Sequence, residues 1–292
     1  MSLQGPFFSI THTLIYYEKH FKNIYEEPLE NVGIQTLIVP YEKIHEFYKC
    51  GEYIYVLYVP HDVLTTDSLN YPGCKLCKTS QLVITGKYHL YNVNTIKTLN
   101  LKITPEYIND VCSLGLIDIL DFLVTSNYSF EYDDWSLYYA SVSNQEKVLK
   151  WWFNSGLPLK YSTSAMDCAS DRGYTNILQL WKDSGVRLAY TGLAMAYASK
   201  NGHVNALQWW KDSGLTIRYL KYALTWATSF NRINVLEWWK DSGLPLAYPS
   251  NLLDGAEEYG CQQSIQWWKD SGLPYHRDNT HDDDLKDFVD DF

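Results

Sequence analysis

The chain lacks the features that mark membrane-spanning and secreted proteins. No apolar run approaches the roughly 18 residues that a membrane-spanning helix needs. The first residues do not show a charged segment followed by an apolar one, as a secretory signal peptide would. The six cysteines are scattered and form no short disulfide framework. We therefore expect a protein that is not secreted, that works in a reducing compartment such as the cytoplasm or nucleus, and that has no membrane partner.

Basic charge and catalytic motifs are also scarce. Asp and Glu number 34 against 24 Lys and Arg, so the formal net charge is -10. Nucleic acids require a basic face, so we expect none as a partner, and basic protein surfaces or peptides fit the charge better. The chain has no phosphate-binding glycine loop, no Gly-x-Ser-x-Gly and no His-Glu-x-x-His. We therefore expect a protein that is not an enzyme and needs no cofactor.

What the chain does have is a motif, Trp-Trp-Lys-Asp-Ser-Gly, which occurs almost unchanged four times and in degraded form twice more. Its second tryptophan recurs every 29 residues, at Trp152, Trp181, Trp210, Trp239 and Trp268. Its closing glycine has the same period, at Gly156, Gly185, Gly214, Gly243 and Gly272. The pattern continues one unit upstream at Leu123 and Asn127. A fixed period of this length predicts a solenoid, whose units stack to bury their apolar faces.

Each unit is predicted to hold two helices joined by a tight turn. In one unit the first helix covers residues 164–171 and the second residues 176–184, with Ile177, Leu178 and Trp181 as the apolar stripe. The turn position holds only residues that tolerate a left-handed backbone, namely Gly115, Asn144, Gly173, Gly202, Asn231 and Gly260. A tyrosine in the segment between units also keeps the period, at Tyr132, Tyr161, Tyr190, Tyr219 and Tyr248.

The tryptophans permit two interpretations. An aromatic face can stack nucleobases, but burying a tryptophan removes ~150–250 Å² from water, which favours a place in the core. We therefore expect the second tryptophan of each motif to be buried. The first member, which lies one residue off the stripe, is expected to be half-exposed, at Trp151, Leu180, Trp209, Trp238 and Trp267.

Residues 1–104 do not share the repeat and are predicted to form a small α/β domain. Helices are expected at 13–21 and 41–50, strands at 34–39, 53–59, 81–85 and 88–93, and a surface loop at 62–73. Pro105 resembles a helix start, which places the domain boundary at 104. Six repeats would then cover 105–277, followed by an acidic tail, 278–292, that is expected to be disordered.

Cys74 and Cys77 form the one short motif with chemistry of its own. A Cys-x-x-Cys can act in redox exchange when it opens a helix after a strand, or supply half of a zinc site when a second pair is near. No second pair exists in the sequence. A structural role, a zinc site and a redox pair all stay open.

The repeat units resemble ankyrin repeats. Gly202-His203-Val204-Asn205-Ala206-Leu207 is similar to the second-helix signature of that family, and Ser164-Ala165-Met166 with Ala169 to the first-helix signature. The tandem tryptophans and the short unit look most similar to ankyrin-type repeats of giant DNA viruses of amoebae. Lys49 to Tyr55, followed by Val59-Pro60, resembles the leader domain of those viral proteins.

The resemblance implies a mainly α fold, an ankyrin-like α-solenoid of helix pairs behind a small N-terminal α/β domain. It also implies protein–protein interaction, with a host protein as a possible partner, inside the host cell or in the virion. The unit is about four residues shorter than the ~33 of the family. The histidine of the first-helix signature is replaced, by Tyr138, Asp167, Ala196, Thr225 and Asp254.

A binding surface is expected where the units differ, because residues that maintain the fold keep the period. Such positions lie on the first helices and at the ends of the joining segments. They are Tyr139, Asp167, Asp171, Lys200, Lys221 and Glu257. The predicted function is a non-enzymatic scaffold or adaptor that binds a protein. The alternative is a redox or zinc-binding module around Cys74 and Cys77, which the repeats target.

Overall fold

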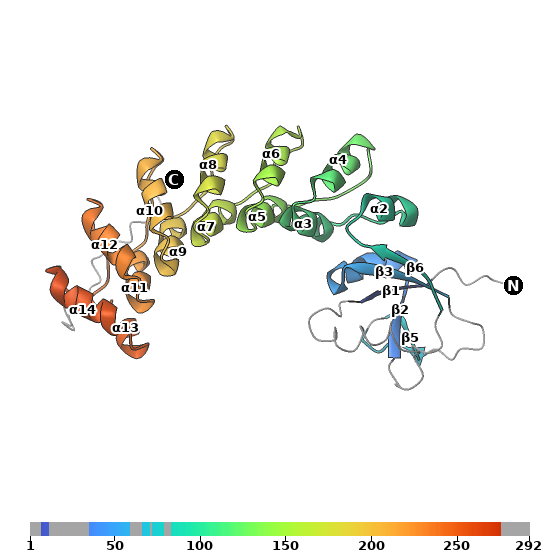
Figure 1. Ribbon diagram of the computed structural model, residues 1–292, viewed down its shortest axis with the longest axis horizontal. Coiled ribbons are helices and arrows are strands. Elements are labelled where there is room, and N and C mark those ends of the chain that lie inside the picture. The colour runs from blue at the N-terminus through green and yellow to red at the C-terminus, as the bar shows by residue number, and fades with distance from the viewer. Residues whose placement is uncertain (1–6, 12–34, 59–65, 71, 79–82, 276–292) are drawn as a thin grey trace. The chain divides into compact units, whose positions relative to one another are not determined.

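The structure, a computed structural model, describes residues 7–11, 35–58, 66–70, 72–78 and 83–275. It is mainly helical, with many helices packed in pairs and a smaller set of strands (Figure 1). Two compact units are present, Met1–Val111 with Asp118–Glu131, and Cys112–Ile117 with Tyr132–Phe292. The first predicted repeat thus contributes to both. No helix of the described part combines the length and the apolar character needed to cross a membrane.

The first unit contains a sheet whose strands, in the described part of the chain, pair antiparallel in the order β4-β5-β2-β1-β3-β6. β1 lies between β2 and β3, with Phe8 opposite Val39 on one side and Val56 on the other. Ile38, Val39, Ile54 and Leu57 are buried and supply the core of this sheet. The strands are β1 (Phe7–Thr11), β2 (Gln35–Pro40), β3 (Tyr53–Tyr58), β4 (Thr66–Asp67), β5 (Lys75–Lys78) and β6 (Val83–His89).

A helix predicted between β2 and β3 is confirmed as a 3-10 helix, η1 (Tyr41–Cys50). Its apolar residues Ile44, Phe47 and Tyr48 are buried. The Tyr48 ring meets that of Tyr107 edge-on, with centroids 5.5 Å apart, and its hydroxyl donates to a backbone carbonyl. Burial raises the pKa of both hydroxyls well above the ordinary tyrosine value. These contacts connect η1 to the helical part of the same unit.

Two predictions for this unit are wrong. Residues 88–93 do not form a strand of their own, because β6 ends at His89 and helix α2 (Val93–Leu99) begins four residues later. Asn92 ends the extended run, since its side chain accepts a hydrogen bond from the backbone N–H of Asn94 at 2.8 Å and caps the helix. The predicted loop 62–73 includes strand β4, and residues 62–65 and 71 lie outside the described residues. So do the helix expected at 13–21, the strand start at 34, and the tail 278–292.

Behind α2 the helices follow in pairs, one pair to each 29-residue unit. In the second of the two compact units, the first helix of each pair contacts the first helix of the next pair, and the second helices contact one another in the same way. Each first helix also packs on the second helix of its own pair. The pairs are α3 (Pro105–Leu114) with α4 (Ile117–Thr125), α5 (Trp135–Val142) with α6 (Glu146–Asn154), α7 (Ser164–Asp171) with α8 (Thr175–Asp183), α9 (Leu193–Asn201) with α10 (Val204–Asp212), α11 (Tyr222–Ser229) with α12 (Ile233–Asp241), and α13 (Asp254–Glu258) with α14 (Gln262–Ser271).

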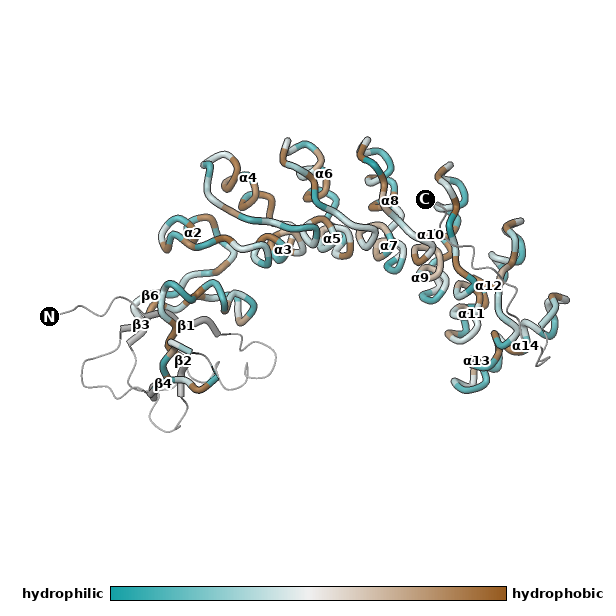
Figure 2. The backbone as a smooth tube through the Cα atoms, turned by 180° about the vertical axis from the view of Figure 1, so that it is seen from behind, coloured by the Kyte–Doolittle hydropathy of each residue, from teal (hydrophilic) through white to brown (hydrophobic). Residues whose placement is uncertain are grey.

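The hydrophobic residues of these pairs face inward at the predicted positions. Figure 2 shows brown, hydrophobic stretches that recur from one pair to the next. On α8 the buried residues are Ile177, Leu178 and Trp181, and on α7 they include Ala165 and Met166. Each of the five units from α5 to α14 thereby buries one tryptophan between its own helices and those of the preceding unit.

The turn predictions are confirmed by the backbone. Every residue of the turn series between the two helices has a positive φ, from 56° at Asn231 to 85° at Gly202. The glycine that closes each second helix also has a positive φ, such as 74° at Gly214. Ser213 secures this end, since its hydroxyl donates to the carbonyl of Trp210 and accepts from the N–H of Leu215. The serine of the repeated motif is therefore a helix-terminating residue.

Candidate functional site

The most conspicuous motif of the sequence proves to be structural. The second tryptophans are buried, and each donates its indole N–H to a side chain 40 residues earlier, on the first helix of the preceding unit. The acceptors also keep the 29-residue period. The bonds are Trp152 to Cys112 (3.2 Å), Trp181 to Ser141 (2.9 Å), Trp210 to Ser170 (2.9 Å), Trp239 to Ser199 (2.9 Å) and Trp268 to Thr228 (2.8 Å). The hydroxyl acceptors donate in turn to a carbonyl of their own helix, as Ser170 does to Met166 at 3.0 Å.

The periodic tyrosines complete this arrangement. Each ring lies against a buried tryptophan, as Tyr190 does against Trp210 with centroids 4.7 Å apart. Each hydroxyl donates to a carbonyl 26 residues later, as Tyr190 does to Thr216 at 2.9 Å. The series therefore joins successive segments between helix pairs. The second tryptophans of the motif are buried and leave no aromatic face available for stacking a base.

The first tryptophans are half-buried, as predicted, and form a second series of contacts. Trp209 donates its indole N–H to Gln179 Oε1 at 2.9 Å, and Trp238 donates to Gln208 at 2.8 Å. The amide nitrogen of Gln179 donates to Asp183 one turn along the same helix. The Asp of the motif thus orients the glutamine that receives the next tryptophan.

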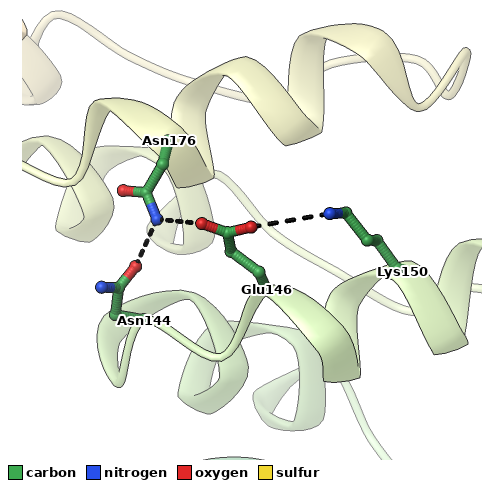
Figure 3. Close-up of polar contacts among 4 residues, drawn as sticks. All are labelled: Asn144, Glu146, Lys150 and Asn176. Atoms are coloured by element: carbon green, nitrogen blue, oxygen red, sulfur yellow. Dashed lines mark hydrogen bonds and ion pairs between the residues drawn. The ribbon is translucent and has the colours of Figure 1, made fainter.

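A polar network joins two consecutive units at their turns (Figure 3). The amide nitrogen of Asn176 donates to Asn144 Oδ1 at 2.7 Å and to Glu146 Oε1 at 2.6 Å, and Lys150 lies 3.5 Å from the same carboxylate. The hydrogen bond from Asn176, together with Lys150, lowers the pKa of Glu146. Each of the four residues is engaged by another of them, so we interpret the network as a connection between units and not as a binding site.

The predicted binding residues have different environments. Tyr139 is 38% exposed and packs against Trp135 and Tyr138, and Glu257 is exposed on α13. Asp167 is only 3% exposed. Its carboxylate accepts hydrogen bonds from the backbone N–H and the hydroxyl of Thr191, at 2.9 and 2.8 Å, so it binds the next unit and is not available to a partner.

The remaining three predicted residues are partly exposed. Asp171 accepts from the Asn201 amide at 2.6 Å. Lys200 lies over two aromatic rings, those of Trp226 and Phe230, at 5.8 and 5.0 Å from the centroids, and Lys221 lies over Tyr222 at 5.9 Å. The structure thus brings Lys200 and Lys221 into one neighbourhood, around the aromatic residues of α11.

Among the exposed aromatic residues on or directly after the described first helices, only Tyr139 was predicted from the sequence. Trp135 is 48% exposed on α5, and Tyr222 is exposed on α11. Phe230 and Tyr259 are exposed just after α11 and α13, at one repeat position that is Arg172 and Asn201 in other units. The signal was present in the sequence, because Trp135 and Tyr222 share one repeat position that is not aromatic in the other four units. The same holds for the position of Phe230 and Tyr259.

The cysteine pair lies at a strand and not at the opening of a helix, which is the position expected of a redox pair. Cys74 is buried just before strand β5, and Cys77 belongs to that strand, opposite Thr36 of β2. No helix begins here among the described residues, and burial raises the pKa of the Cys74 thiol, which disfavours the reactive thiolate. Within the described ranges, no group of three or more His, Cys, Asp or Glu side chains is placed to hold a metal ion.

Comparison with known proteins adds no assignment to these contacts. No protein-family model matches the chain, and no curated protein matches it.

Proposed function

We propose that the chain is an ankyrin-like solenoid that acts as a non-enzymatic adaptor and binds a protein partner through the exposed side of its first helices. The observation that supports this most directly is the presence of exposed aromatic side chains there, at Trp135 and Tyr139 on α5 and at Tyr222 on α11. Tryptophan and tyrosine are enriched among the residues that dominate protein–protein binding energies. The viral resemblance makes a host-cell protein the partner we propose.

Within each 29-residue unit, the residues that recur and the residues that vary have different roles, which also supports the proposal. The residues that recur in the units, such as Trp210 and Tyr190, are engaged in contacts between units. The first-helix position of Tyr139 is Cys168, Tyr197, Trp226 and Gly255 in the units that follow. A surface that varies while the core repeats is the arrangement by which stacked repeats recognise one partner among many.

Affinity capture with matched variants tests this function. The full chain, a Trp135→Ala/Tyr139→Ala/Tyr222→Ala variant and a control, Lys147→Ala/Lys182→Ala/Glu237→Ala, are each immobilised and exposed to an amoebal cell lysate. The control residues are exposed on the second helices. We expect one protein to be retained by the native chain and the control, and reduced at least ~10-fold with the aromatic variant. Equal retention by all three chains, or no retained protein, would contradict the proposal.

A further inference from the structure

The charge of the chain is distributed unevenly along the repeats. Residues 184–236 contain six Lys and Arg but one acidic residue, Asp212, in a chain whose net charge is -10. Helices α9 and α11 carry no carboxylate at all. Carboxylates return on the neighbouring first helices, with Asp171 on α7 and Glu257 on α13. The first helices α9 and α11, with Lys200 on α9 and Lys221 directly before α11, therefore form a basic island that lies between first helices with acidic residues.

Aromatic rings lie on the same island. The Trp226 ring is stacked with the rings of Tyr197 and Tyr222, whose centroids are 5.7 and 5.9 Å away at interplanar angles of 6° and 21°. Lys200 lies over Trp226 and over Phe230. We call this cluster the α9–α11 surface, made of Tyr197, Lys200, Lys221, Tyr222, Trp226 and Phe230. It presents apolar area and positive charge together, which suits a segment that is both apolar and acidic.

The chain itself contains such a segment. Residues 282–292 hold six aspartates. Between them Leu285, Phe288, Val289 and Phe292 are spaced at three, four and seven residues, the spacing of one face of a helix. Asp and apolar residues thus alternate so that a helix of this sequence would have an apolar stripe flanked by negative charge.

The segment is tethered close to the surface. The described chain continues to Tyr275, just after α14, and α14 and α13 both contact α11. Ten residues of extended chain span at most ~33–36 Å, whereas neighbouring helices lie ~8–10 Å apart. The residues between 275 and 285 therefore suffice to reach the α9–α11 surface. A short tether also gives an effective concentration in the millimolar range, so even a weak contact would be populated.

We propose that residues 282–292 bind the α9–α11 surface of their own chain and cover it until a protein partner displaces them. The aspartates face Lys200 and Lys221, and the apolar stripe lies on the rings of Tyr222, Trp226 and Phe230. This inference rests on the proposed function only for the role of the partner. The binding of the segment itself does not depend on any partner. Experiments can therefore reject the binding of the segment while the proposed function stands, or reject the proposed function while the binding of the segment stands.

The test measures, by fluorescence anisotropy, the affinity of a labelled peptide of residues 278–292 for full-length chains that are titrated into it. One chain is native, and a second carries Asp282→Asn, Asp283→Asn, Asp284→Asn, Phe288→Ser and Phe292→Ser, which disables its own segment. A third chain combines the substitutions of the second chain with Lys200→Glu/Lys221→Glu, which remove the basic charge of the α9–α11 surface. Lys182→Glu/Lys211→Glu is the matched control, since both lysines are exposed on second helices.

We expect the peptide to bind the chain with the disabled segment at least ~10-fold more tightly than the native chain, whose own segment competes. Lys200→Glu/Lys221→Glu should weaken binding at least ~10-fold, the control less than ~3-fold, and added salt should weaken it further.

Three results would overturn the proposal. The first is equal affinity for the native chain and the chain with the disabled segment. The second is binding that Lys200→Glu/Lys221→Glu does not weaken. The third is equal binding of a peptide of the same composition whose Leu, Phe and Val residues are moved off the helical spacing. A single-stranded oligonucleotide that binds the surface where the peptide does not would assign it to nucleic acid and also reject the proposal.

Discussion

The two compact units of this protein reach stability in different ways. In the compact unit that holds the repeats, called here the repeat unit, the same set of contacts occurs five times. A buried tryptophan donates a hydrogen bond to a side chain 40 residues earlier, and a tyrosine ring packs on the tryptophan. In the N-terminal unit each contact occurs once, as in the packing of Tyr107 on Tyr48 and the bond from the Tyr107 hydroxyl to the carbonyl of Leu90. The repeat unit therefore provides internal replicates of these contacts, whereas the N-terminal unit depends on single contacts.

The largest expected effect is the loss of one tryptophan from the buried series. Trp210→Ala should lower the free energy of unfolding by about 3–5 kcal/mol, because it opens a cavity and removes the donor to Ser170. All 11 tryptophans lie at position 135 or later, so fluorescence during denaturant unfolding reports on the repeat unit.

Trp209→Ala is the matched control for that substitution, since this neighbour is half-buried and should cost about 1 kcal/mol. Trp181→Ala and Trp239→Ala should resemble Trp210→Ala if the copies are true replicates. Equal costs for Trp209→Ala and Trp210→Ala would refute the assignment of the second tryptophan to the core.

A smaller effect is expected when the acceptor is removed instead of the donor. Ser170→Ala leaves the buried indole N–H of Trp210 without its partner, at a cost of about 1–3 kcal/mol. Ser170→Thr should cost less, because Thr228 already performs this role for Trp268 at 2.8 Å. Denaturant unfolding of both variants measures the difference, and a larger loss from threonine than from alanine would contradict the hydrogen-bond explanation.

The N-terminal unit should lose stability at alkaline pH because it contains a buried tyrosine hydroxyl. Burial raises the pKa of Tyr107 in the folded state above the unfolded value of about 10. The hydroxyl stays protonated in the folded state while it ionises in the unfolded chain. Its contribution to stability is therefore complete below about pH 10 and is lost as pH rises toward the folded pKa, by about 1.4 kcal/mol per pH unit.

Hydrogen exchange of the amides around Tyr107, compared between pH 9 and pH 11, measures this loss. Tyr107→Phe has no ionisable group there, so its stability should fall less steeply with pH than that of the native chain. The same slope in both chains would show that this tyrosine is not responsible.

The smallest expected effect on stability is at the exposed first-helix residues. Tyr139→Ser, which removes a ring that is 38% exposed, should change the free energy of unfolding by no more than about 0.5 kcal/mol. The same substitution should weaken capture of the protein partner. A stability loss as large as that of Ser170→Ala would place Tyr139 in the core of the repeat and not on a binding surface.

The sequence predicted the repeat unit closely because each position is observed several times. The turn residues with positive φ, the buried stripe of Ile177, Leu178 and Trp181, and the limits of α7 all follow from residues that recur at 29-residue steps. In the N-terminal unit no such replication exists. Helix α2 was therefore missed, although Asn92 offered a cap signal, because the aromatic run before it continued a strand pattern.

The candidate site was predicted less well, and Asp167 shows why. Its position varies among units, which predicts an exposed binding residue, yet its carboxylate is buried against Thr191, 24 residues later. Variation can reflect exposure, or it can reflect a pair of residues in two units that changed together. The residue type at one position does not show which of the two explanations applies. The hydrogen bonds between Asp167 and Thr191 in the structure do.

The constant 40-residue reach of the tryptophan bonds has a further consequence for how such a chain can change its length. A tandem duplication of any 29 residues within the array restores, on both sides of the new junction, a tryptophan and an acceptor at the same separation. The inserted copy would meet complementary neighbours at once, without compensating substitutions elsewhere. Growth by duplication is thereby compatible with stability at every step, and the freshly copied surface residues are then free to diverge.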